Sequence, residues 1–141
     1  MSSINVSSHG AEIKCATGTV PAASAAGTVN GSAIDRQGFD WAVVEVATGA
    51  VTGSPTTQTL DVKLQHSDSD SSGFDDLTGA AVTQLTAASS RKRKTISLKG
   101  AKRYIRAVAV TAFSGGSTPT LASSSAVILG GAAVLPAQSD D

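Results

Sequence analysis

The sequence predicts an all-β protein, an antiparallel β-sandwich of the jelly-roll or immunoglobulin-like kind. Ser and Thr supply 35 of the 141 residues, whereas Glu occurs only twice, a balance that favours pleated strands over helices. Short apolar segments with period-two alternation are separated by loops rich in Gly, Ser, Asp and Pro. Helical segments that would cover a parallel sheet are missing between them, so antiparallel pairing is expected.

The chain is long enough for one domain. Residues 1–32 carry few large side chains and cannot form their own core, so we expect an extended or flexible N-terminal arm that could become ordered against a neighbour. Residues 33–130 are the expected sandwich, and residues 131–141 an Ala-rich C-terminal tail.

The strand signals follow one another along the sandwich segment. Residues 39–46 form a nearly continuous apolar run, and residues 59–66 alternate strictly between apolar and polar side chains. Residues 77–88 fit either a short helix or a strand, with the strand favoured slightly. Further strands are expected at 95–98, 103–111 and 124–129. The expected core residues are Trp41, Val43, Leu60, Val62, Leu64, Ile96, Leu98, Ile105 and Val108.

Catalytic and metal-binding patterns are weak. His66 is followed by Ser67 and Asp68, but adjacent residues of an extended chain point to opposite faces, so no triad is expected. His9, His66 and the single cysteine, Cys15, are too scattered for a zinc site. We therefore expect no enzyme, no cofactor and no metal.

The segment after residue 67 resembles the opening of a calcium loop. Asp68, Asp70 and Ser72 provide alternating oxygens, and Gly73 stands at the sixth position. The twelfth position is Gly79 where a bidentate Glu is needed, so a solvated hairpin loop is the favoured interpretation.

Charge is unevenly distributed, although the net charge is zero. Eight of the eleven basic residues lie between residues 91 and 106. The candidate protein-contact patch is Arg91, Lys92, Arg93, Lys94, Lys99, Lys102 and Arg103, joined by Arg106. The candidate acidic contact loop is Asp68, Asp70, Asp75 and Asp76.

Three interpretations of this layout stay open: solvated loops, docking on an acidic protein or an adjacent copy, and nucleic-acid binding. The last is disfavoured because the chain is neutral and poor in stacking aromatics.

No apolar run of 18 residues predicts a membrane span. The N-terminus lacks the pattern of a secretory signal, so we expect synthesis in a cytoplasm, with retention there or release by lysis, and no Sec export.

Several segments together resemble small virion proteins of tailed bacteriophages, the head decoration, cement or minor capsid proteins. These segments are LDVKLQHSDSD at 60–70, FDDL at 74–77, KTISLKG at 94–100 and RYIR at 103–106. The resemblance covers residues 33–130 and is one of strand and loop cadence.

The resemblance implies a subunit on the outer surface of an icosahedral capsid that bridges major capsid subunits, often as a trimer. Its expected partners are the major capsid protein and other copies of itself. The alternatives are a receptor- or glycan-binding fibre domain (an adhesin) and a tail or connector component.

Overall fold

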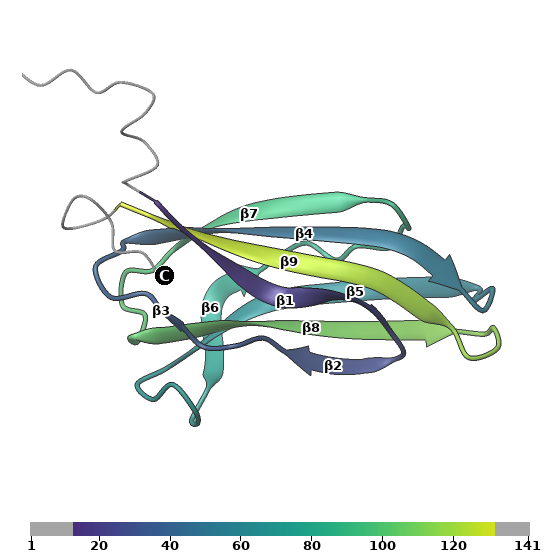
Figure 1. The fold of residues 1–141 in the computed structure, drawn as a ribbon, viewed down its shortest axis with the longest axis horizontal. Helices are drawn as coiled ribbons and strands as arrows, with labels where there is room; N and C mark the ends of the chain where they lie inside the picture. The colour runs from purple at the N-terminus through teal and green to yellow at the C-terminus, as the bar shows by residue number, and fades with distance from the viewer. Residues whose placement is uncertain (1–12, 132–141) are drawn as a thin grey trace, which may run out of the picture.

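The computed structural model describes residues 13–131, and all of their regular elements are β-strands (Figure 1). The all-β prediction is confirmed. The strands are β1 (Lys14–Ser24), β2 (Gly27–Asn30), β3 (Ile34–Asp35), β4 (Trp41–Thr52), β5 (Thr57–Ser67), β6 (Asp75–Ala81), β7 (Arg91–Ser97), β8 (Tyr104–Ser114) and β9 (Thr120–Gly130).

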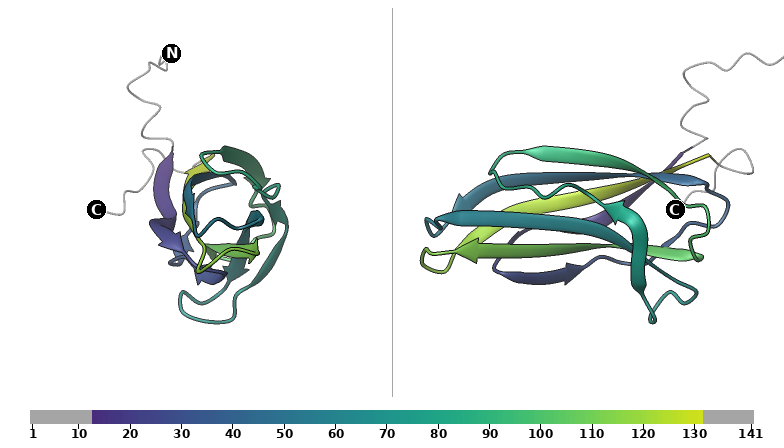
Figure 2. Two further views of the ribbon diagram at one scale, coloured as in Figure 1. Left: turned by 90° about the vertical axis from the view of Figure 1, so that its right-hand side faces the viewer. Right: turned by 180° about the vertical axis from the view of Figure 1, so that it is seen from behind.

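The strands form two antiparallel sheets that face each other (Figure 2). Sheet A has the order β1-β9-β4-β7, and sheet B has the order β2-β8-β5-β6, with β3 also paired to β8. β1 begins and β9 ends at the same end of the elongated sandwich, because they pair antiparallel with Lys14 opposite Leu129.

The core lies between the two sheets and consists mainly of Leu, Val and Ile. Strict alternation in β5 buries Leu60, Val62 and Leu64, as predicted. Ile96, Leu98, Ile105 and Val108 are buried as well. Val108, however, lies outside the main cluster, on the opposite face of β8 from Ile105 and Ala107, and its register partner in β2 is Asn30.

Two core predictions, Trp41 and Val43, are wrong. β4 turns Ala42, Val44 and Val46 inward, each with no exposed surface, while Trp41 is 37% exposed on the opposite face. The run is apolar on both faces of the strand, so its alternation carried no information about which face is buried. The Trp41 indole lies over Gly130 of β9, where any Cβ would come within 2.1 Å of the ring.

Residues 14–30, within the segment expected to be an arm, form β1 and β2 and pair with β9 and β8 of the same chain. Their small side chains explain both the expectation and the outcome. They offer little apolar surface, but they let two edge strands approach closely. His9 and the tail beyond Gly131 lie outside the described residues.

The ambiguous segment 77–88 begins as a strand, since β6 reaches Ala81. Beyond it the backbone is irregular, but Leu85 exchanges two backbone hydrogen bonds with Leu60, of 2.8 and 2.9 Å. Leu85 is buried and closes the core on this side of the sandwich.

Candidate interaction surfaces

The basic run 91–94 forms most of β7, the edge strand of sheet A. Because side chains alternate along a strand, this run separates into two pairs. Lys92 and Lys94 share the face of the buried Ile96, whereas Arg91 and Arg93 face outward. The predicted patch is therefore not one surface.

Lys92 and Lys94 are used within the chain. The Lys92 ammonium donates to the Gln84 carbonyl and the Lys94 ammonium to the Ala81 carbonyl, both at 2.9 Å. These bonds span from sheet A to the end of β6 in sheet B and to the segment that follows it. Inward-pointing edge lysines of this kind also disfavour pairing with another strand.

Arg91 and Arg93 stand on the outer face of sheet A beside one acid. Glu45 of β4 is the register partner of Arg93, and its carboxylate lies 3.8 Å from the Arg91 guanidinium. The Arg91 side chain is 79% exposed, so this ion pair is solvated and leaves the arginine accessible to a partner.

The remaining bases lie near the turn between β7 and β8. Lys99 is exposed, and the Lys102 ammonium is 4.0 Å from the Asp68 carboxylate. Arg103 binds Asp35 of β3 at 2.9 Å, and its guanidinium hydrogen bond holds the pKa of that carboxyl below its ordinary value. Arg103 also lies over the Tyr104 ring, 5.2 Å from its centroid.

Arg36 is a structural residue that the sequence analysis missed. Its guanidinium donates to three backbone carbonyls: those of Ala101, of Lys102 at 2.9 Å and of Phe39 at 3.2 Å. These bonds join the loop before β4 to the turn before β8. An isolated arginine among small residues gives no sequence signal of this role.

The predicted acidic loop is also divided. Asp68 and Asp70 lie in the loop after β5, whereas Asp75 and Asp76 begin β6. Asp76 accepts from the Lys63 ammonium at 2.7 Å and from the Gln65 amide at 2.9 Å, and these bonds lower its pKa. Within residues 13–131 no three His, Cys, Asp or Glu side chains gather as a metal site requires.

Arg106 fixes the far end of the same loop. Its guanidinium donates twice to the Gln65 side-chain oxygen, at 2.8 and 2.9 Å, and lies 4.3 Å from the centroid of the Phe74 ring. The chain thus uses this base internally.

His66 has a local structural contact. Its Nδ1 accepts a hydrogen bond from the Lys102 backbone at 3.2 Å. The neighbouring Ser67 hydroxyl is buried and donates to the Ser72 carbonyl inside the loop. Ser67 is thus turned toward its own loop, away from the imidazole, as the alternation of the strand requires.

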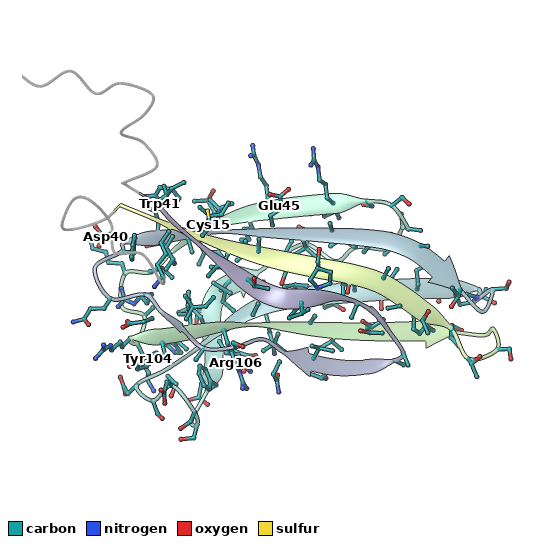
Figure 3. The ribbon with its side chains drawn as sticks, viewed as in Figure 1. Cys15, Asp40, Trp41, Glu45, Tyr104 and Arg106 are labelled. Carbon is teal, nitrogen blue, oxygen red and sulfur yellow. The ribbon has the colours of Figure 1, made fainter. Side chains whose placement is uncertain are left out.

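The outer face of sheet A carries an apolar half at the end where β1 begins. Strand register places Cys15, Ile128 and Val43 in one row and Trp41 beside Gly130 in the next. Ile13 is 39% exposed, and Cys15 is exposed near Trp41 (Figure 3). We refer to Ile13, Cys15, Trp41, Val43 and Ile128 as the apolar half, and to Glu45, Arg91 and Arg93 as the charged corner.

A groove of about 440 Å³ runs between β1 and β2, at the edge of the sandwich opposite β7. It is lined by small, apolar and hydroxyl side chains such as Ala16, Thr19, Val29 and Ser123, together with the amide of Asn30. The lining residues include no acid or base that could take part in catalysis. Residues 13–131 contain no helix that is long and apolar enough to cross a membrane.

No protein-family model matches this chain, and no curated protein matches its sequence. Solved structures are similar in fold. The PBSX exported protein XepA superposes with a TM-score of 0.55 at 17% identity, over 90% of this chain and 40% of that one.

Two further structures have lower scores. The infectious bursal disease virus VP2 subviral particle gives a TM-score of 0.49 at 16% identity, over 86% of this chain and 33% of that one. A Bacillus endospore appendage, described as a disulfide-linked pilus, gives 0.43 at 14% identity, over 84% and 88%. The chain therefore spans less than half of XepA and of VP2, and the likeness to XepA establishes a β-sandwich fold.

Proposed function

We propose that this chain is a virion structural protein that decorates an icosahedral phage capsid and stabilises it by bridging major capsid subunits. The observation that supports this most is the outer face of sheet A. This face presents the exposed apolar half and the charged corner side by side on one four-stranded sheet. Such a face suits docking on another protein, with apolar contacts for affinity and charges for register.

The distribution of chemistry supports the same role. Among the described residues, several ionisable side chains pair across strands and loops, as Lys63 does with Asp76 and Arg103 with Asp35. These pairs reinforce the sandwich and its loops. A decoration subunit acts in many copies, so modest single interfaces suffice when they are linked on one lattice. A trimer of copies is part of this proposal.

Binding to particles tests the proposal. Purified capsids stripped of this protein should take it up at the outer shell, visible as added density by cryo-electron microscopy. The Arg91→Gln/Arg93→Gln variant should bind roughly tenfold more weakly, or about 1.4 kcal/mol, and with less dependence on salt. A Thr28→Glu/Thr86→Glu variant changes net charge equally on exposed positions away from this face, and should bind normally.

Density confined to the tail, or absent from the virion, would contradict capsid decoration. A ring of copies at the head–tail junction would instead favour the tail or connector role.

Glycan binding is a second candidate, favoured by the exposure of Trp41 (37%), because exposed indoles are a common surface for sugars. A glycan array that gives strong hits, abolished by Trp41→Ala, would favour this fibre or adhesin role.

A further inference from the structure

The outer face of sheet A is divided along its length. In β4, outward positions run from Trp41 and Val43 at the apolar half to Glu45, which lies beside Arg93 at the charged corner. An apolar end and a cationic end on one face of a sheet suit an extended segment that is apolar first and acidic afterwards.

The chain leaves the sandwich beside the apolar half. β9 ends at Gly130, which lies under the Trp41 ring, and Gly131 follows with φ +67°. A Cβ on Gly131 would lie 3.0 Å from Cδ1 and Nε1 of the same indole. The described chain therefore ends against Trp41 at Gly131, a glycine whose left-handed conformation turns the backbone just before residue 132.

The composition of residues 132–141 matches the face in the same order. The segment begins Ala-Ala-Val-Leu-Pro and ends Ser-Asp-Asp. We propose that this segment docks on the outer face of sheet A of its own chain, with Val134 and Leu135 on the apolar half and Asp140 and Asp141 at Arg91 and Arg93.

The reach of the segment allows this placement. Arg91 is paired with Ala47, six residues along β4 from Trp41, which is about 20 Å at about 3.3 Å per residue. Two strand spacings add about 10 Å sideways, so the direct span is about 22 Å. The nine residues from Gly131 to Asp140 can extend about 30 Å. Val134 and Leu135 follow Gly131 by three and four residues and can extend about 10 to 13 Å from it, which places them over the apolar half.

Docking within one chain is favoured over exchange between copies. The segment is tethered at the site itself, which gives it an effective concentration in the millimolar range. Pro136 lacks a backbone N–H and cannot continue a strand ladder, so side chains would make the contact. The same face is proposed to contact the capsid, so this covering describes the chain free in solution, and docking on a capsid would displace the segment.

Trp41 is the single tryptophan of the sequence and reports the contact directly. We compare the full chain with Val134→Ser/Leu135→Ser by fluorescence and acrylamide quenching. The variant should show red-shifted emission and a quenching constant about twofold higher, because covering would remove at least half of the 37% exposure of Trp41. Asp140→Asn/Asp141→Asn should weaken the cover and remove its salt dependence.

Asp68→Asn/Asp70→Asn is the matched control, since it removes two loop acids elsewhere and should leave Trp41 fluorescence unchanged. Equal quenching in the full chain and Val134→Ser/Leu135→Ser would overturn the proposal. A cover that strengthens with protein concentration, together with a larger mass by light scattering, would overturn docking within one chain. Capsid uptake is a second readout on the same variants. Loss of the Trp41 cover with normal capsid uptake would overturn only this inference, and a covered Trp41 in a chain that no capsid takes up would overturn only the proposed function.

Discussion

The two open sides of the sandwich are closed by opposite means. On the β1/β2 side, backbones approach so closely that a Cβ on Gly31 would lie 1.9 Å from the Gly18 carbonyl oxygen. On the β7/β6 side, Lys92 and Lys94 span the gap to backbone carbonyls. We call the β1/β2 side, where Gly18 and Gly31 let the backbones meet, the tight seam. We call the β7/β6 side, where Lys92 and Lys94 reach across the gap and also protect the edge strand β7, the bridged seam.

Gly31→Val should have the largest effect on this comparison. The new side chain would meet the Gly18 carbonyl and the Ala107 carbonyl, 3.0 Å from the Cβ position, and both are backbone atoms that cannot yield. We expect a loss of about 3 kcal/mol or more in unfolding free energy, measured by urea denaturation.

Gly49→Ala is the control, because its Cβ would meet only Ala122, at 3.2 Å from the methyl carbon and 3.8 Å from the carbonyl oxygen. Equal losses in the two variants would contradict a tight seam at Gly31.

Ser125→Ala tests the polar part of the same seam. Its hydroxyl accepts from the Thr19 backbone at 2.8 Å and lies 2.9 Å from the Thr19 hydroxyl, and both residues are buried. Removing it leaves buried groups unpaired, so we expect a loss of about 2 kcal/mol by the same measurement. Ser124→Ala, in a less buried neighbouring position, should cost little. An equally large loss of unfolding free energy in Ser124→Ala would contradict a specific role for the hydroxyl pair of Thr19 and Ser125.

Lys92→Met/Lys94→Met tests the bridged seam. Each lost bond to a carbonyl is exposed, so we expect only about 0.5 kcal/mol per residue. The main result should be self-association, seen by light scattering, because the edge of β7 loses its protecting charges. Lys99→Met, outside the strand, should stay unassociated, and association of that control alone would refute the edge explanation.

The smallest effect should come from the ion pair between Arg103 and Asp35, which joins the turn before β8 to β3. The Asp35 pKa is lowered in the folded chain, so its contribution is present above the unfolded pKa of about 3.9 and is lost as pH falls through the lower folded value. The Asp35 side chain is 38% exposed, so we expect less than about 1 kcal/mol.

Arg103→Gln should therefore lower the unfolding free energy slightly at pH 7 and match the original chain in strong acid. A difference that grows as pH falls would have the wrong sign for this pair.

The buried side chains of a strand were predictable wherever the strand exposes one face to solvent. β5 alternates strictly, and its buried residues followed from the sequence, whereas β4 is apolar on both faces and its inward face did not. The basic run was visible from charge alone, but its role as a contact patch stays a prediction. The separation of this run into bridging lysines and free arginines depends on strand phase and on what lies across the gap.

By itself, the sequence determined the class of this protein, because β-branched and hydroxyl residues with period-two alternation can bury one face only as sheets. Tertiary structure decided where residues 14–30 belong, which face of β4 is inside, and which charges remain free. These outcomes depend on contacts between residues far apart in the chain, such as Gly18 with Gly31 and Trp41 with Gly130, and local composition does not record them.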